Sequence, residues 1–287
     1  MTRGRATAIG FGAVLLWSLL ALFTVGSAPV PPLLLNAITF AIGGALGVVW
    51  TIASGSAGQL RTVRPAVYLF GTAALFGYHL LYFSALRLAP PAEASLIAYL
   101  WPLFIVLFSG LLPGERLTAG HVFGALLSFA GAALIVLRSG GGFDPAHAKG
   151  LILAFFAALT WATYSVVSRR FGTVPTASVT VFCLGTALLS AAAHLALEET
   201  VWPQSALGWA SIIALGLGPV GLAFYIWDIG VKRGDIQLLG VSAYAAPLIS
   251  TLVLLAAGLA PATPQIAIAA ALITGGAWVA ARAGARR

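Results

Sequence analysis

Ten stretches of about twenty apolar residues follow one another along the chain, and only short connections separate them. A helix needs about 20 consecutive apolar residues to cross the hydrocarbon core of a bilayer. Almost nothing remains outside these stretches to build a water-soluble domain. The sequence therefore predicts an all-α membrane protein with ten transmembrane helices in a lipid bilayer. The predicted spans are residues 6–26, 32–53, 65–88, 92–112, 118–137, 149–168, 175–197, 206–231, 236–257 and 264–281.

Composition and charge placement support this interpretation. Hydrophobic residues make up 60% of the chain and charged residues 8%, against about 25% charged in soluble domains. If the N-terminus is cytoplasmic, twelve of the fifteen Lys and Arg lie on the cytoplasmic side, and only Arg87, Arg138 and Lys149 lie outside. Cytoplasmic loops carry such an excess of basic residues. We therefore expect both termini in the cytoplasm, and we assign the net charge of +8 to topology and not to nucleic-acid binding.

The chain also contains a long internal repeat. The segment Tyr99–Pro102 has the pattern Tyr-x-x-Pro, which recurs 145 positions later in Tyr244–Pro247, and Gly131 recurs as Gly276 at the same offset. Each half holds five spans, and because five is odd, the second half must enter the membrane upside down. A single membrane domain, residues 1–287, is thus predicted to contain repeat one, about residues 5–138, and repeat two, about residues 147–287.

Inverted repeats are the usual construction of secondary transporters, which hold the solute between the halves near the bilayer midplane. Two inverted five-helix repeats around a central cavity are therefore the predicted architecture. Pro102 and Pro247 fall in mid-span, where proline kinks or breaks a helix and frees backbone groups for other partners. We expect the two prolines to serve as gating hinges, although simple curvature for packing is the alternative.

Several other function classes find no support. The sequence has no G-x-x-x-x-G-K-[ST], H-E-x-x-H, C-x-x-C or G-x-S-x-G pattern, so it shows no phosphate-binding loop, zinc-protease helix, redox motif or nucleophile elbow. Its four histidines are far apart in the sequence, and Cys183 is its only cysteine. We therefore expect no enzyme activity, no cofactor and no metal site.

Aromatic residues provide the positive evidence for a binding site. Trp and Tyr normally collect at the two membrane interfaces, and Trp50, Trp202, Trp209, Trp227 and Trp278 fit that pattern. Other Trp and Tyr residues fall at mid-depth, where an unsatisfied polar group costs several kcal/mol. Packing between helices is the simple explanation for one such ring, but the whole set suggests a midplane cavity. The predicted substrate-binding residues are Trp17, Tyr78, His79, Tyr82, Tyr99, Trp101, Trp161 and Tyr244.

His79 is the strongest single candidate. Ionisable residues inside spans are rare and face the bundle interior or a pathway. His79 shares a helical face with Tyr82. An unperturbed histidine titrates at about pH 6.5, so this side chain can also relay protons. The alternative is an interhelical hydrogen bond without a role in transport.

Two acidic residues are explained by local structure rather than by a role in transport. Asp228 precedes Lys232 by one helical turn, which predicts an ion pair. Glu93 follows two prolines at the start of the fourth span, where a carboxylate complements a helix N-terminus. The sequence therefore shows no free acidic group deep in a span, although aromatic faces can also hold a cation.

Residues 82–136 resemble the EamA repeat of the drug/metabolite transporter superfamily. The resemblance rests on Tyr82 through Glu93-Ala94, on Pro102, on Pro113-Gly114-Glu115-Arg116-Leu117, and on Gly124 to Gly131. The second half matches less well, since Ala260 stands at the position equivalent to Glu115. Within the superfamily the chain looks closest to exporters of aromatic amino acids.

The resemblance implies a ten-helix basket around a central cavity, export by alternating access, and a location in the inner membrane of a Gram-negative bacterium. We therefore expect an exporter of amino acids, aromatic ones preferred. An exporter of flat organic cations or drugs in the same fold is one alternative. A membrane-embedded enzyme or assembly subunit without transport is the other.

Overall fold

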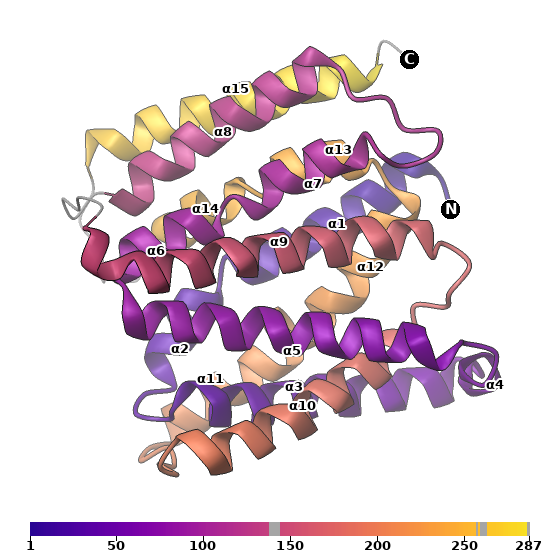
Figure 1. Ribbon diagram of the computed structural model, residues 1–287, viewed down its shortest axis with the longest axis vertical. Helices are drawn as coiled ribbons and strands as arrows, with labels where there is room; N and C mark the ends of the chain where they lie inside the picture. Colours follow the sequence, from indigo (N-terminus) through magenta and orange to yellow (C-terminus); the bar gives the residue numbers. More distant parts are fainter. Residues whose placement is uncertain (138–143, 257, 259–262, 286–287) are drawn as a thin grey trace.

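The computed structural model describes residues 1–137, 144–256, 258 and 263–285, and within these residues it contains helices and no strand. Ten helical segments in this part of the chain are long and apolar enough to cross a membrane. The all-α fold and the ten spans predicted from the sequence are thereby confirmed. The helices run side by side across the molecule, and the N-terminus and the C-terminal end of α15 lie at the same end (Figure 1). We call this the terminal end.

Six spans are continuous helices. They are α3 (Pro32–Ala53), α5 (Pro65–Leu88), α8 (Ala119–Val136), α9 (Ala148–Arg170, preceded by the 3-10 turn η2, Pro145–His147), α10 (Ser178–Leu197) and α15 (Pro264–Ala285). Several of these spans begin with proline, which has no N–H to leave unpaired at the first helical position. A short helix, α4 (Ala57–Leu60), precedes α5.

The other four spans are interrupted. They comprise α1 (Arg3–Trp17) with α2 (Leu20–Gly26), α6 (Pro91–Ala98) with α7 (Trp101–Ser109), α11 (Ala206–Leu217) with α12 (Ala223–Arg233), and α13 (Ile236–Ser242) with α14 (Ala245–Ala256). A π-helical turn, η3 (Gly218–Leu222), joins α11 to α12. Pro102, Pro219 and Pro247 lie at or just after three of these interruptions, because proline cannot continue the hydrogen-bond ladder.

Small residues bring α8 and α15 together. A Cβ added to Gly131 would lie 2.9 Å from the Ala269 carbonyl oxygen and equally close to Ile273. In the same contact Ser128 Oγ donates to the Ile273 carbonyl at 3.2 Å. Small side chains allow the close backbone approach on which helix packing in lipid depends. Gly131 and Gly276, which stands 145 positions later, both lie in this contact.

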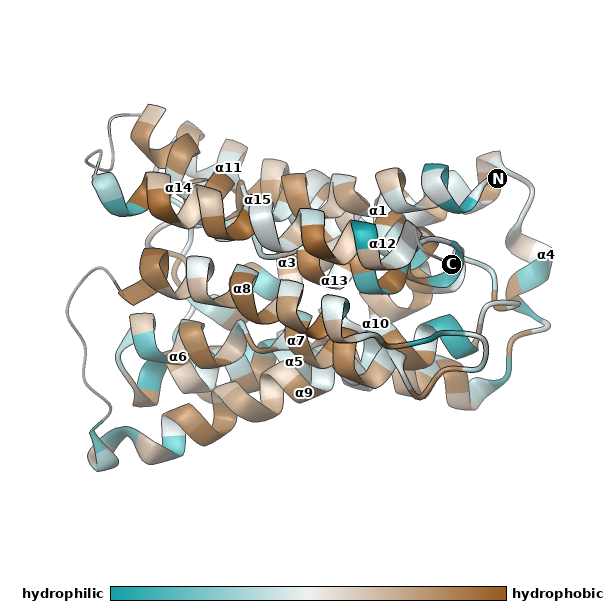
Figure 2. Ribbon diagram, turned by 90° about the horizontal axis from the view of Figure 1, so that it is seen from above, coloured by the Kyte–Doolittle hydropathy of each residue, from teal (hydrophilic) through white to brown (hydrophobic). Residues whose placement is uncertain are grey.

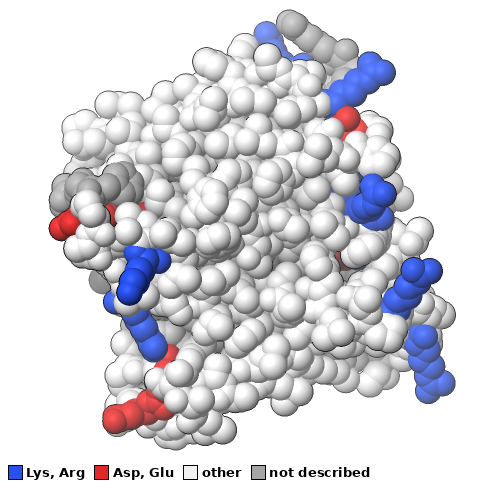
Figure 3. Space-filling model, in the orientation of Figure 1, with Lys and Arg blue, Asp and Glu red and all other residues white. Residues whose placement is uncertain are grey.

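Charged side chains gather at the two ends of the bundle, and the surface between them is nearly free of charge in the view of Figure 3. Hydrophobic residues dominate the middle of the helices (Figure 2). At the end opposite the termini, buried Glu198 accepts from the backbone N–H groups of Leu33 and Leu34, at the start of α3. It also pairs with Arg87 at 2.5 Å. A carboxylate there complements the helix N-terminus, so this end is held by residues that are distant in the sequence.

Candidate functional site

The two Tyr-x-x-Pro segments meet inside the bundle. Each marks the point where its span is interrupted, α6 before α7 and α13 before α14. Pro102 stands in the first turn of α7, where backbone N–H groups lack helical partners. The hydroxyl of Tyr244 accepts a hydrogen bond from one of them, the Leu103 N–H, at 3.1 Å. The Tyr of the second segment thus satisfies a donor that the break in the first segment exposes.

Four tryptophans form the centre of the bundle. Trp17, Trp101 and Trp161 come from α1, α7 and α9, and the ring of Trp17 lies 6.1 Å from that of Trp101 and 5.6 Å from that of Trp161. The fourth is Trp227 of α12, whose ring centroid is 5.0 Å from that of Trp17. Trp17 Nε1 donates to the carbonyl of Pro219, in the π-helical turn, at 3.0 Å. The contacts of Trp17 with Trp101 and Trp161 are edge-to-face, an arrangement that stabilises pairs of aromatic rings. We call Trp17, Trp101, Trp161 and Trp227 the tryptophan cluster.

Trp227 corrects the sequence analysis, which placed it at a membrane interface. It is fully buried, and its Nε1 donates to Ser165 Oγ at 3.1 Å. Its position near the charged end of the span, directly before Asp228, fits an interfacial ring, but α12 lies inside the bundle. By contrast, Trp202, Trp209 and Trp278 are each more than 40% exposed.

Trp101 shows why an ideal helix is a poor guide at this place. On a regular helix it would point about 160° away from Tyr99. Span four is interrupted between Tyr99 and Trp101, so the regular spacing does not apply. Trp101 is 7% exposed and packs within the tryptophan cluster.

His79 lies beside the cluster on α5. Its Nδ1 is 2.7 Å from the carbonyl oxygen of Leu75, which in the neutral ring places the proton on Nδ1 and leaves Nε2 as an acceptor. The ring contacts Phe40 at 5.0 Å and Tyr78 at 5.1 Å between centroids. The imidazole is thus half-buried among aromatic rings and held by its own helix.

A cavity of about 340 Å³ lies between the two halves of the chain. Tyr82, Ser95 and Tyr99 line it from the first half, and Pro247 lines it from the second. The hydroxyls of Tyr82 and Ser95 are 3.0 Å apart. The remaining lining residues are Pro91, Ala92, Ile135, Val136, Ser250 and Thr251. Because these include the first turn of α6 and the last residues of α8, the cavity lies toward the end opposite the termini.

Aromatic rings connect this cavity to the tryptophan cluster. Tyr82 stacks on Tyr78 with centroids 6.0 Å apart, and Tyr78 contacts Trp161 at 5.4 Å. The structure therefore brings seven of the eight predicted residues into the cavity, the cluster or the rings between them. Tyr244 is the exception, because it is buried against Phe129 on the side of α8 and α15. Sequence analysis did not single out Phe40 or Phe224, whose rings lie 5.0 and 6.3 Å from that of His79, since apolar rings in an apolar span carry no signal of their own.

The two acidic candidates lie where their helices place them. Lys232 Nζ is 2.9 Å from Asp228 Oδ1, so the predicted pair is present, but both side chains are at least 95% buried. Glu93 lies in the first turn of α6 and is 3% exposed. In the described part of the chain its Oε2 has no hydrogen-bond partner.

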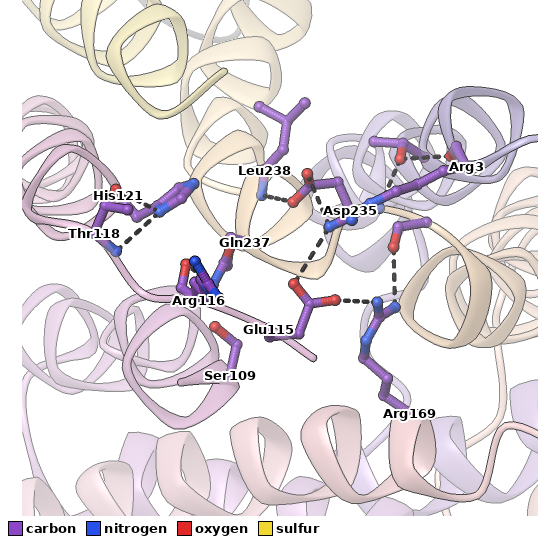
Figure 4. A network of polar contacts seen from close by, with 12 residues as sticks. Arg3, Ser109, Glu115, Arg116, Thr118, His121, Arg169, Asp235, Gln237 and Leu238 are labelled. Carbon is purple, nitrogen blue, oxygen red and sulfur yellow. Dashed lines mark hydrogen bonds and ion pairs between the residues drawn. The ribbon is translucent and has the colours of Figure 1, made fainter. Parts of the chain in front are cut away.

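Charged residues close the terminal end of the bundle (Figure 4). Glu115 pairs with Arg3 at 3.3 Å and also with Arg169. Arg3 pairs in addition with Asp235 at 3.1 Å, and Arg169 Nη1 donates to the Gly234 carbonyl at 2.9 Å. We call Arg3, Glu115, Arg169 and Asp235 the terminal-end network. It joins the start of α1 and the segment after α7 to the end of α9 and the start of α13, and no local pattern in the sequence predicts it.

A cavity between two sets of five spans, lined by Tyr82 and Tyr99, is an arrangement suited to a small solute. Among the residues that the structure describes, no group of three His, Cys, Asp or Glu could hold a metal ion. The model of the EamA-like transporter family matches this chain twice, over residues 5–137 and 148–282. The chain belongs to the EamA-like transporter family. It is accordingly a multi-pass membrane protein of a transporter family.

Known relatives cover nearly the whole chain. The protein named aromatic amino acid exporter YddG of Ancylobacter novellus is 56% identical over 283 residues, which are 98% of each chain. A protein of the same name from Escherichia coli K12 is 26% identical over 307 residues, with 99% of this chain and 100% of the relative covered. A solved crystal structure with 54% sequence identity aligns with a TM-score of 0.93, over 97% of this chain and 98% of that one.

Proposed function

We propose that this protein exports amino acids, aromatic ones preferred, from the bacterial cytoplasm across the inner membrane, and that it acts as a transporter and not as an enzyme. The single observation that carries the proposal is the series of contacting aromatic rings that joins the cavity at Tyr82 and Tyr99 to the tryptophan cluster. The printed names of two relatives, both aromatic amino acid exporters, support the choice of substrate.

The cavity and the aromatic rings that adjoin it have the chemistry that an aromatic amino acid requires. Rings of Tyr78, Tyr82 and Trp161 offer faces and edges to an aromatic side chain. The hydroxyls of Tyr82 and Ser95 and the acceptor Nε2 of His79 offer hydrogen bonds to its polar end. An apolar pocket with few convergent polar groups is the usual form of a small-molecule site.

We further propose that the two halves are inverted repeats, with both termini cytoplasmic, and that the solute crosses by alternating access. The double match of the family model and the contact of Tyr244 with Leu103 support this arrangement. With that topology the terminal-end network closes the cytoplasmic side, while the cavity faces outward. The interruptions at Pro102 and Pro247 are then the hinges between the two states.

An exporter of flat organic cations is the rival function, and one observation favours it: the many buried ring faces can bind a cation. Proteoliposome flux separates the two functions. We expect saturable flux of labelled phenylalanine and tryptophan, and a His79→Ala variant with reduced flux at an unchanged protein level. Flux of a flat quaternary amine without any amino-acid flux would overturn the proposal. A requirement for a proton gradient would indicate coupling and would make His79 the first candidate for the relay.

A further inference from the structure

Asp228 and Lys232 form an ion pair in buried surroundings, where placing charged groups costs free energy. Asp228 is 1% exposed and Lys232 is 5% exposed by side chain, and both lie on α12 inside a membrane span. The free energy of removing two charges from water exceeds that of their mutual attraction unless the geometry is excellent. A buried pair is therefore weak evidence of a role in stability. Charged residues within membrane spans mark solute or ion pathways by default.

The pair lines a small cavity that is separate from the one beside Tyr82. The cavity has a volume of about 10 Å³, which is room for about one water molecule. Three phenylalanine rings share its wall with the two charged groups, Phe70, Phe171 and Phe182. Positive charge, negative charge and aromatic rings thus surround one point.

The connection between α9 and α10, residues 171–177, covers this cavity. Thr176 Oγ1 donates to Asp228 Oδ2 at 2.7 Å, and Lys232 Nζ donates to the Val174 carbonyl at 3.0 Å. The covering segment therefore holds both charged groups by single hydrogen bonds. Its displacement would leave Asp228 and Lys232 held only by each other.

The small cavity also adjoins the tryptophan cluster. Tyr164 lies between them on α9, with its ring 5.3 Å from that of Trp161. It packs against Phe70 and Phe182 at 6.2 and 6.4 Å. Its buried hydroxyl has no hydrogen-bond partner among the residues that the structure describes. A solute at Asp228 is thus one side chain away from the cluster.

We propose that Asp228 and Lys232 form a loading subsite for the zwitterion of an aromatic amino acid on the terminal-end side of the bundle. When residues 171–177 move aside, Asp228 binds the α-ammonium group and Lys232 binds the α-carboxylate, while the phenylalanines hold the side chain. The solute replaces the ion pair, so no charge is left unpaired at any step. The inference rests on the proposed function, because it supplies that function with its entry site.

The test compares ligands that differ only in charge, applied to the terminal-end face of inside-out membrane vesicles. Phenylalanine, phenethylamine and 3-phenylpropionate compete there against labelled phenylalanine, and each variant reports a ratio of inhibition constants. We expect Lys232→Met to lower the preference for phenylalanine over phenethylamine by about 10-fold, the value of one lost hydrogen bond to a charged group. Asp228→Asn should lower the preference over 3-phenylpropionate by a similar factor.

Two further variants make the result decisive. Arg87→Met breaks an ion pair at the opposite end, and we expect it to leave both ratios unchanged. If a single variant does not fold, the double variant Asp228→Asn/Lys232→Met replaces it, because it leaves no unpaired charge. Both preferences should fall in the double variant. Wild-type ratios in the double variant, or equal weakening of all three ligands, would identify a purely structural pair and overturn the inference. Absence of phenylalanine flux in the wild type would instead overturn the proposed function, and the loading subsite with it.

Discussion

Neutralising Glu115 should open the terminal end of the bundle. Glu115 is the shared partner of Arg3 and Arg169 in the terminal-end network, and its side chain is 4% exposed. A hydrogen bond between charged, largely buried groups contributes about 1.5–3 kcal/mol. The pair with Arg3, whose side chain is 48% exposed, adds no more than about 0.5 kcal/mol after screening. Glu115→Gln should thus weaken closure by about 2 kcal/mol, which is a shift of about 30-fold between closed and open states.

Cysteine labelling measures this shift directly. Cys183 is the only cysteine and is buried, so Cys183→Ala provides the background. In it, Ser168→Cys, in the last turn of α9 and 5% exposed, reports on the terminal end, and Ser95→Cys reports on the cavity beside Tyr82. An impermeant maleimide is added from the terminal-end side. We expect Glu115→Gln to raise the labelling rate of Ser168→Cys at least 10-fold, which lies within the shift of about 30-fold calculated above. Labelling of Ser95→Cys from the opposite side should fall.

A matched control is Asp144→Asn, which alters an exposed carboxylate that caps only its own turn at the other end. It should leave both labelling rates unchanged. Equal rates for Glu115→Gln and this control at both reporter positions would refute the reasoning, because the network would then contribute nothing to closure.

Three further predictions follow from individual contacts. Tyr244→Phe leaves the buried Leu103 N–H unsatisfied and should lower the free energy of unfolding by about 1–3 kcal/mol, seen as a lower midpoint in thermal unfolding in detergent; an unchanged midpoint would contradict it. Trp227→Ala should abolish most phenylalanine flux, whereas the exposed Trp278→Ala should retain it; equal flux in the two variants would refute the role of the cluster. Gly276→Val places a branched side chain against the backbone of α8. Overpacking of this kind destabilises a protein by about 1–3 kcal/mol, so we expect a smaller monodisperse peak of folded protein in size-exclusion chromatography.

Local pattern sufficed for the elements of this fold. Apolar length predicted all ten spans, because a segment in lipid must satisfy its own backbone hydrogen bonds and is long enough to cross only if it is apolar. Pro102 and Pro247 predicted where two helices are interrupted, since a missing N–H acts within one turn. The spacing of Asp228 and Lys232 likewise predicted their contact.

Tertiary structure alone decided which residues share a site. The sequence suggested an interfacial ring for Trp227 and a substrate-binding ring for Tyr244, yet Trp227 joins the tryptophan cluster and Tyr244 supports the backbone of α7. Glu115 meets Arg3 and Arg169 only after four segments converge at the terminal end. Local sequence determines the length and breaks of a helix, because these depend on neighbours within a few residues. Which face a helix turns inward depends on packing against helices that lie a hundred or more residues away, and a single sequence does not contain that information in any local pattern.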